Sequence, residues 1–391
     1  MIEVDSQHNR TIAVLAGHAP SLVIFRGPLI RLLAEMGHRV IAMAPTTPGW
    51  SERIEQLGAT FAPVEFARAS IDPIGDLKAY MAIRRVLDRH SVDTLLAYTI
   101  KPIVYGLPAA LRAGVATRVA LVTGLGYAFG SETLRQRIVS AVAGRLYRKA
   151  LAQATAVRFQ NPDDQRFFVD SGFVSMDRTD VVAGSGVDLD FYPFVDPPTS
   201  PSVQFLLIAR LLADKGIREY VRAARVVRAK LPDTTFRLVG PPDPNPMAIQ
   251  PRELDEWRAE GIVDVLPGTD DVRPHLAACD VYVLPSYREG TPRTVLEAMA
   301  TGRPIVTTDA PGCRETTKIG ENGFLVPVRD PDALAMAMIR LAEDRALRER
   351  MGRRSRAIAE EKYDVRRVND AMMRAMGLSP RLNGSHVEAR P

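Results

Sequence analysis

The sequence has little cysteine and no long apolar stretch. Its 391 residues include two cysteines, Cys279 and Cys313, and neither stands at a spacing typical of a zinc site or a disulfide framework. No uninterrupted apolar run approaches the length of a membrane span, and the first ten residues are polar. We therefore expect a cytoplasmic protein in a reducing compartment, with neither a spanning helix nor a secretion signal.

The glycine pattern of dinucleotide dehydrogenases is also missing, because no Gly-x-Gly-x-x-Gly follows the first apolar run at 11–17. What the chain does have is a regular alternation of apolar runs and helical stretches. This alternation predicts parallel sheets with helices on both faces, which is an α/β fold. With 46% hydrophobic residues, a chain of this length can bury two cores.

A proline-rich cluster at 196–201 divides this alternation into two halves. We therefore expect an amino-terminal domain over 1–195 and a carboxyl-terminal domain over 196–362. The stretch 379–391 is typical of a disordered tail. The formal charge of +5 indicates an anionic partner such as a nucleotide, a lipid phosphate or an acidic membrane surface.

The segment 285–312 is the most informative part of the chain. The apolar run 281–284 before it predicts a buried strand, and Thr291 with Pro292 supplies an N-cap and a first-turn proline for a short helix. Glu289 would then lie at the carboxyl end of a strand, where open α/β sheets bind their ligands.

Two carboxylates and a run of backbone amides give this segment its chemistry. Glu297 follows Glu289 by eight residues and lies inside the predicted helix. A carboxylate there can accept hydrogen bonds from the vicinal hydroxyls of a ribose or hexose, while the amides of 290–293 can donate to phosphate. Two glutamates at this spacing mean nothing alone, so the surrounding string has to support the interpretation.

A basic motif follows the apolar run 203–208. Arg210 and Lys215 stand in the string Ala-Arg-Leu-Leu-Ala-Asp-Lys-Gly, between that predicted strand and a helix expected at 217–230. Taken alone, both would be ordinary solvated cations. Fixed cations after a strand can also stabilise the negative charge that develops on a departing nucleoside diphosphate.

Both motifs resemble those of a known enzyme family. Residues 285–306 are similar to the signature P-S-x-x-E-G-x-P-x-x-x-L-E-A-M-A-x-G-x-P-V-V of the retaining nucleotide-sugar glycosyltransferases of family 4, which have the GT-B fold. The basic motif resembles their G-R-L-x-x-x-K-G element, with Ala209 in place of the first glycine. The resemblance implies two Rossmann-like, doubly wound parallel-sheet domains facing a cleft, with a helix at 363–378 crossing back to the first.

The resemblance also implies roles for these residues. Arg210 and Lys215 would hold the donor diphosphate. Glu289 would steady the sugar and its developing positive charge, and Glu297 would bind the ribose. The donor phosphate would help to take the acceptor proton, and because cationic side chains replace a metal, we expect no metal or other cofactor. The expected donor site also includes loop residues near the phosphates and the nucleobase: Gly290, Thr291, Pro292 and Gly268.

The amino-terminal half is expected to bind the acceptor. Its segments 25–30, 98–106 and 122–129 resemble the bacterial branch that builds lipid-linked oligosaccharides, whose members move a hexose or amino sugar from UDP to a saccharide on polyprenyl diphosphate. A helix-surface arginine, a solvated lysine and a tight turn would explain the same residues. The candidates are two cations near predicted helix starts and two glycines that allow close approach to the backbone: Arg26, Lys101, Gly124 and Gly126.

One histidine of the family has no counterpart here. Many relatives carry it in the loop after the fifth strand of the first domain, where this chain has Thr-Gly-Leu-Gly at 123–126. His18, beside Gly17 after the first predicted strand, is a further acceptor-site candidate. A lone histidine is more often structural or solvated.

A basic helix face predicts contact with a membrane. In a helix expected at 131–154, Arg137, Arg145 and Arg148 fall within an arc of roughly 80° at about 100° per residue. Such a face beside aliphatic side chains can lie on an anionic interface, although a solvated surface has the same pattern. We expect peripheral association with the inner face of the cytoplasmic membrane.

Two alternatives stay open. A transferase of the same fold could act on a soluble acceptor, and a nucleotide-sugar-binding regulator could have lost turnover. The presence of both cations and both glutamates disfavours the regulator. No nucleic-acid partner is expected.

Overall fold

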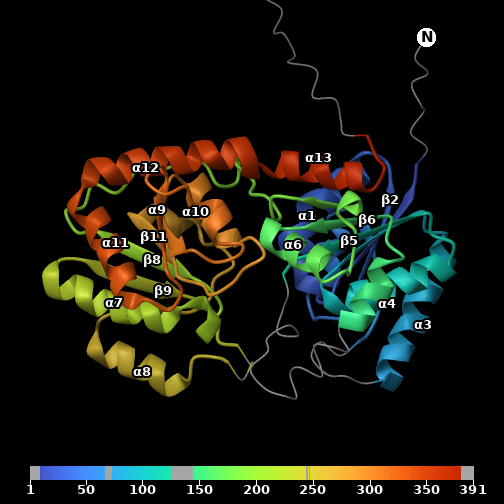
Figure 1. Ribbon diagram of the computed structural model, residues 1–391, viewed down its shortest axis with the longest axis horizontal. Coiled ribbons are helices and arrows are strands. Elements are labelled where there is room, and N and C mark those ends of the chain that lie inside the picture. The colour runs from blue at the N-terminus through green and yellow to red at the C-terminus, as the bar shows by residue number, and fades with distance from the viewer. Residues whose placement is uncertain (1–8, 67–72, 125–143, 244, 246, 380–391) are drawn as a thin grey trace, which may run out of the picture. The chain divides into compact units, whose positions relative to one another are not determined.

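The computed structural model describes residues 9–66, 73–124, 144–243, 245 and 247–379. By their internal contacts these residues form two compact units. The first unit holds residues up to 160, 164–182 and those from 368 onward, and the second holds 161–163 and 183–367. Each unit is built around one parallel sheet (Figure 1).

The sheet of the first unit has the strand order β3-β2-β1-β4-β5-β6-β7. Successive residues of β1 face opposite sides, as a strand requires: Ile12 and Val14 join one hydrophobic cluster, and Ala13 and Leu15 join another. Because both faces are buried there, the central strands β1 and β4 are nearly continuous apolar runs, whereas the edge strand β7 is not. The seven strands are β1 (Thr11–Leu15), β2 (Arg39–Ala44), β3 (Ala59–Pro63), β4 (Thr94–Tyr98), β5 (Thr117–Val122), β6 (Ala156–Phe159) and β7 (Thr179–Val181).

Helices cover both faces of this sheet. One cluster is shared with α1 (Ala19–Glu35) and α2 (Ser51–Glu55). The other is shared with α3 (Pro73–His90), α4 (Ile100–Arg112) and α6 (Pro162–Asp170). The arrangement is doubly wound, as the alternation of the sequence predicts.

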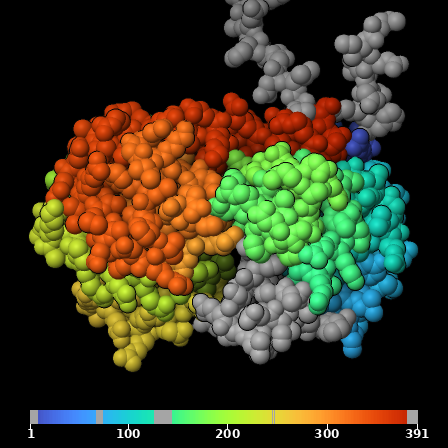
Figure 2. All heavy atoms as spheres, viewed as in Figure 1, coloured from blue at the N-terminus to red at the C-terminus, as the bar shows by residue number. Residues whose placement is uncertain are grey.

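The sheet of the second unit has the strand order β10-β9-β8-β11-β12-β13. In Figure 2 the face in view of this unit is covered largely by the orange and red atoms of its later segments. Its strands are β8 (Gln204–Ile208), β9 (Thr235–Val239), β10 (Asp264–Leu266), β11 (Val281–Leu284), β12 (Ile305–Thr308) and β13 (Gly323–Val326). Its helices are α7 (Ile217–Lys230), α8 (Pro251–Glu260), α9 (Arg273–Ala278), α10 (Arg293–Ala300), α11 (Pro331–Glu343) and α12 (Arg345–Ile358).

The last helix, α13 (Val365–Ala375), ends among residues of the first unit. Met372, Met373 and Met376 are buried in the same hydrophobic cluster as α1. The Arg10 guanidinium also donates a hydrogen bond to the Met376 carbonyl at 3.4 Å. The chain therefore returns to the first unit after completing the second.

Each sheet reverses its strand order once. The reversal lies between β1 and β4 in the first unit and between β8 and β11 in the second. In sheets of this type, ligands bind beyond the carboxyl ends of the strands at that point. The loops after β8 and β11 carry Arg210, Lys215 and Glu289. The loop after β1 carries His18, and Lys101 lies in the first turn of the helix that follows β4.

The expected fold class, two Rossmann-like parallel-sheet units, is confirmed. Part of the basic helix expected at 131–154 lies outside the described residues, including Arg137, whereas residues 144–151 are helical. The expected disordered tail lies outside them from residue 380. No helix within the described ranges is long and apolar enough to cross a membrane.

Candidate functional site

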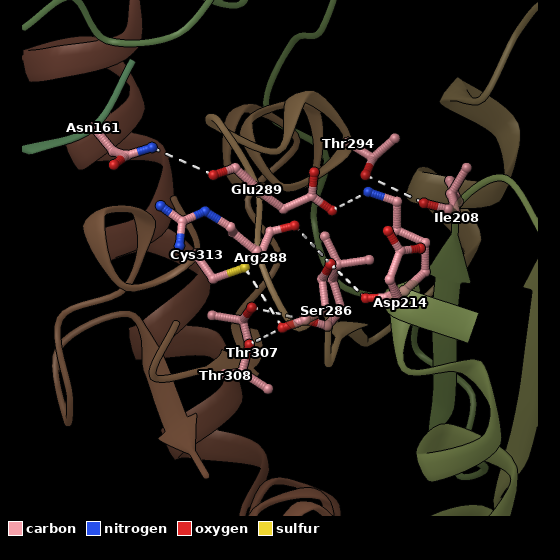
Figure 3. A network of polar contacts seen from close by, with 12 residues as sticks. Asn161, Ile208, Asp214, Ser286, Arg288, Glu289, Thr294, Thr307, Thr308 and Cys313 are labelled. Carbon is pink, nitrogen blue, oxygen red and sulfur yellow. Dashed lines mark hydrogen bonds and ion pairs between the residues drawn. The ribbon is translucent and has the colours of Figure 1, made fainter. Parts of the chain in front are cut away.

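The loops after β8 and β11 are joined by hydrogen bonds. The Tyr287 backbone N–H donates to the Asp214 carbonyl at 2.8 Å, and the Ser286 hydroxyl donates to the same carbonyl at 3.1 Å. Figure 3 shows Asp214 and Ser286 meeting at the strand ends. The turn Ala213–Lys215 is thereby fixed beside the loop that carries Glu289.

Gly216 makes this close approach possible. Its φ is +69°, in the left-handed region, and a Cβ at this position would lie 2.0 Å from the Pro285 carbonyl oxygen. Any other residue would therefore be strained and would push the two loops apart. The glycine of the basic motif thus determines where Lys215 lies.

Lys215 and Glu289 form an ion pair across the two loops. The Lys215 Nζ lies 2.5 Å from the Glu289 Oε1, and the two side chains are 15% and 16% exposed. Burial lowers the pKa of Lys215, but the Glu289 and Asp214 carboxylates together more than offset this effect, so the pKa lies above its ordinary value. The lysine therefore carries its charge at neutral pH, at the point where the strand order reverses.

The backbone of Glu289 is held from two further directions. Its N–H donates to the Pro311 carbonyl at 2.9 Å. Gly312 has a φ of +81°, and a Cβ there would lie 2.2 Å from the Glu289 carbonyl oxygen. The side-chain amide of Asn161 donates to the carbonyls of Glu289 (3.3 Å) and Gly290 (2.9 Å). The loop of the predicted catalytic glutamate is therefore rigidly placed.

Glu297 is a buried carboxylate with two donors. It is 5% exposed, and its Oε1 accepts hydrogen bonds from the Arg293 guanidinium at 2.7 Å and the Tyr192 hydroxyl at 3.0 Å. Burial raises the pKa of Glu297, while Arg293 and Tyr192 pull it down without cancelling the rise. Glu297, the residue predicted to bind the ribose, therefore accepts hydrogen bonds from Arg293 on its own helix and from Tyr192 in the segment before β8.

Helix α10 begins one residue later than the sequence predicted. Pro292 rather than Thr291 is its N-cap, and no side chain caps the helix. The reason is packing: the Thr291 side chain lies against Gly184, where a Cβ would come within 2.8 Å of it. Pro292 serves as the cap because its carbonyl accepts from the Val295 N–H at 3.1 Å.

Arg210 has an acidic partner that the sequence did not suggest. Its guanidinium lies 2.7 Å from the Asp243 carboxylate, and its side chain is 55% exposed whereas that of Asp243 is 12% exposed. Arg210 also adds a repulsive charge at Lys215. The two cations of the motif are therefore close enough for their charges to repel each other, although only Lys215 contacts Glu289.

Gly268 borders the loop that carries Asp243. It follows β10, and a Cβ at this glycine would lie 2.9 Å from the Pro241 ring. Gly240 brings that loop against β8, because a Cβ there would lie 1.8 Å from the Ala209 carbonyl oxygen. Gly268 and Arg210 thus adjoin the same loop after β9.

The first-unit candidates lie at several places. His18 is the half-buried N-cap residue of α1, and its carbonyl accepts from the Ser21 hydroxyl at 2.6 Å. Gly124 follows β5 with a φ of +136°. Gly126 lies outside the described residues.

The two basic candidates of this unit have different environments. Arg26 was expected near a helix start, which is wrong: α1 begins at Ala19, so Arg26 lies in mid-helix, 2% exposed, with its guanidinium 5.6 Å from the centre of the Tyr98 ring. Lys101 does lie in the first turn of α4 and forms an ion pair with Asp76 at 2.8 Å.

Three site residues were not found from the sequence: Asn161, Tyr192 and Asp243. Each lies far along the chain from the group it contacts, and no motif names it. A weak signal existed for Asn161, because it lies two residues beyond the end of the strand predicted up to Phe159. The described ranges contain no group of three or more His, Cys, Asp or Glu side chains placed to hold a metal.

Two glycosyltransferase family models match the chain in succession. Residues 26–184 match the model described as "Glycosyl transferase 4-like domain", and residues 202–344 match "Glycosyl transferases group 1". The two matches together span about three quarters of the chain. The chain belongs to family 4 of the glycosyltransferases.

Curated relatives of this glycosyltransferase extend over most of its length. It is 29% identical to the N,N'-diacetylbacillosaminyl-diphospho-undecaprenol alpha-1,3-N-acetylgalactosaminyltransferase of Campylobacter jejuni, over 86% of this chain and 90% of the relative. It is 26% identical to the UDP-Gal:alpha-D-GlcNAc-diphosphoundecaprenol alpha-1,3-galactosyltransferase of Escherichia coli, over 75% of this chain and 77% of the relative.

Solved structures share the GT-B fold. The Anabaena protein HepE, crystallised with UDP and glucose, superposes with a TM-score of 0.76 at 19% identity, covering 95% of this chain and all of the other. The sucrose-phosphate synthase of Thermosynechococcus elongatus gives a TM-score of 0.78 at 19% identity, covering 94% and 98%. At this identity the likeness concerns the fold.

Proposed function

We propose that this glycosyltransferase moves a hexose or N-acetylhexosamine from a UDP-sugar to a saccharide on polyprenyl diphosphate, with retention of anomeric configuration. The observation that carries the proposal is the Lys215–Glu289 ion pair at the strand-order reversal of the second unit. It sets a cation for a diphosphate beside a carboxylate for a sugar. Both relatives named above transfer a sugar to a saccharide on diphosphoundecaprenol, which supports the acceptor.

The donor side follows from charge. When the bond between the anomeric carbon and the diphosphate oxygen breaks, negative charge grows on the diphosphate and positive charge on the sugar. Lys215 stabilises the first and Glu289 the second, and neither has to transfer a proton. The acceptor oxygen attacks from the face the diphosphate leaves, and its proton passes to the donor phosphate. Arg210 and Glu297 bind the diphosphate and the ribose.

A lipid-linked acceptor implies contact with a membrane, and we include peripheral association in the proposal. In the first unit, Ile74, Leu77 and Met81 recur at helical spacing along α3 and are 70%, 61% and 43% exposed. Lys78 and Arg85 are exposed on the same helix. An apolar stripe flanked by cations suits an anionic interface.

The basic helix expected at 131–154 gives less support for contact with a membrane. Arg145 is exposed, but the Arg148 guanidinium donates to the carbonyls of Ser171 (2.9 Å) and Gly172 (3.1 Å). The Arg148 guanidinium therefore binds the turn at 171–172 within the same unit. The stripe on α3 is the better support for the membrane part of the proposal.

The test is a panel of nucleotide sugars followed by transfer assays. Calorimetry should show binding of UDP-sugars in preference to GDP- or ADP-sugars, and transfer should then require a saccharide on polyprenyl diphosphate. Transfer to free oligosaccharides at equal efficiency would favour the soluble-acceptor alternative. Donor binding without any transfer or hydrolysis would favour the regulator.

A further inference from the structure

We propose that Asn161 is a positioning residue that aims the backbone amides of Gly290 and Thr291 at the donor diphosphate. The proposal rests on the donor site argued above and adds a residue that no motif contains. Asn161 belongs to the second unit by its contacts and is 0% exposed.

The side-chain amide of Asn161 holds two successive carbonyl groups. Its Nδ2 donates to the Gly290 oxygen at 2.9 Å and to the Glu289 oxygen at 3.3 Å. Figure 3 shows the side chain reaching the Glu289 loop from the side away from Asp214. A carboxamide has two N–H bonds on one nitrogen, so it can hold both carbonyls at once.

Peptide geometry converts this into an orientation of the amides. In a planar trans peptide, the C=O of one residue and the N–H of the next point in opposite directions. Because the carbonyls of Glu289 and Gly290 face Asn161, the N–H groups of Gly290 and Thr291 face away from it. Among the described residues, no acceptor takes the Gly290 N–H.

Two adjacent amides pointing the same way form a concave anion site. They adjoin Glu289, whose carboxylate already pairs with Lys215. A diphosphate bound by Lys215 would therefore meet these amides as well. Backbone donors of this kind are fixed before the ligand arrives and need no reorganisation during the reaction.

The position of Asn161 is itself fixed. Two residues later, the Asp163 carboxylate lies 2.6 Å from the Arg314 guanidinium, which also lies 2.6 Å from Asp309. Arg314 follows the turn at Gly312, and that turn packs on the Glu289 carbonyl. The segment 161–163 and the segment 309–314 therefore hold the Glu289 loop from two sides.

The test compares Asn161→Ala with Asn322→Ala. Asn322 is also 0% exposed in the second unit and also holds backbone, donating to the Thr316 carbonyl at 3.1 Å, but it precedes the amino end of β13. Both variants should lose similar stability. Only N161A should bind UDP more weakly, by about 10- to 100-fold, with a higher donor KM, lower kcat and unchanged acceptor KM. Asn161→Asp, which keeps the shape but loses both donors, should behave like N161A.

Hydrogen exchange of the full chain without ligand gives a second measurement. N161A should speed exchange of the peptide spanning 286–294, and N322A should not. If N161A binds UDP as tightly as the wild type, or its exchange in 286–294 is unchanged, the inference is wrong and the proposed function stands. If the wild type binds no UDP, the donor assignment falls, and with it the role of Asn161 at a diphosphate.

Discussion

The reversal points of the two sheets have the same topology and different chemistry. In the second unit, the loops after β8 and β11 are joined by an ion pair, backbone hydrogen bonds and the close approach at Gly216. In the first unit, the loops after β1 and β4 meet at Gly17, where a Cβ would lie 2.8 Å from the Thr99 hydroxyl, and Thr99 itself has a φ of +69°. Lys101 there is paired with Asp76 on α3 rather than with the opposite loop.

This difference matches what the two units are proposed to bind. A diphosphate with a departing sugar develops opposite charges at fixed places, which a preformed lysine–glutamate pair can stabilise. A saccharide hydroxyl is neutral and is selected by shape and hydrogen bonds. The left-handed backbone at Thr99 is costly for a β-branched residue and is therefore a feature that the fold maintains at the proposed acceptor side.

The largest effect is expected from breaking the loop contact in the second unit. Gly216→Ala would place a methyl group 2.0 Å from the Pro285 carbonyl oxygen at a φ of +69°, and should destabilise the protein by about 3–5 kcal/mol. Gly261→Ala is the matched control, because Gly261 has a φ of +66° and nothing within 4 Å of its Cβ position. It should cost about 1 kcal/mol. If denaturant unfolding shows that both variants lose the same free energy of unfolding, the close approach of Gly216 to Pro285 does not contribute to stability.

Removing the Lys215 cation from its ion pair with Glu289 should lower turnover and leave stability nearly unchanged. Lys215→Ala should lower kcat about a hundredfold, or roughly 3 kcal/mol of transition-state stabilisation, with a melting temperature near that of the wild type. Lys230→Ala removes another lysine from a pair, with Glu343 at 2.7 Å, whose side chains are 55% and 47% exposed. Turnover of that control should not change. A Lys215→Ala enzyme with normal turnover under saturating donor would contradict the assignment.

A smaller effect is expected at Glu297, the carboxylate proposed to bind the ribose. Arg293→Ala leaves Glu297 buried without its guanidinium at 2.7 Å, and should destabilise the protein by about 2 kcal/mol and weaken UDP binding about tenfold. Arg252→Ala breaks an exposed pair of the same spacing, with Glu256 at 2.8 Å, and should cost less than about 0.5 kcal/mol. The measurement is the affinity of each variant for UDP. If Arg293→Ala and Arg252→Ala bind UDP equally well, Glu297 does not contact the donor.

The smallest effect is expected in the first unit. Lys101→Ala should raise the acceptor KM about tenfold, because a hydrogen bond from a cation to phosphate contributes about 1.5 kcal/mol, and should leave UDP affinity unchanged. Asp76→Asn keeps the lysine and removes its partner, and should not raise the acceptor KM. Steady-state kinetics with both substrates varied would show this, and a change in donor KM alone would place Lys101 outside the acceptor site.

Much of the second unit could be predicted from sequence because its chemistry lies in local strings. Glu289 and Lys215 each sit in a motif that also contains the strand, the turn glycine and the helix that place them. Asn161 and Asp243 could not be found in this way, because each joins the site through a contact that depends on how loops of different strands pack. Arg26 shows the opposite failure: its string resembled that of relatives, but the start of α1 at Ala19 put it in mid-helix.

The most direct measurement is a calorimetric titration of UDP into the wild type, Lys215→Ala and Lys230→Ala at equal ionic strength. We expect the wild type and Lys230→Ala to bind UDP with the same affinity. Lys215→Ala should bind UDP about 10- to 100-fold more weakly, because a charge-assisted contact to phosphate is lost. Equal UDP affinity in all three proteins would contradict the claim that the ion pair at the reversal of the second sheet is the donor site.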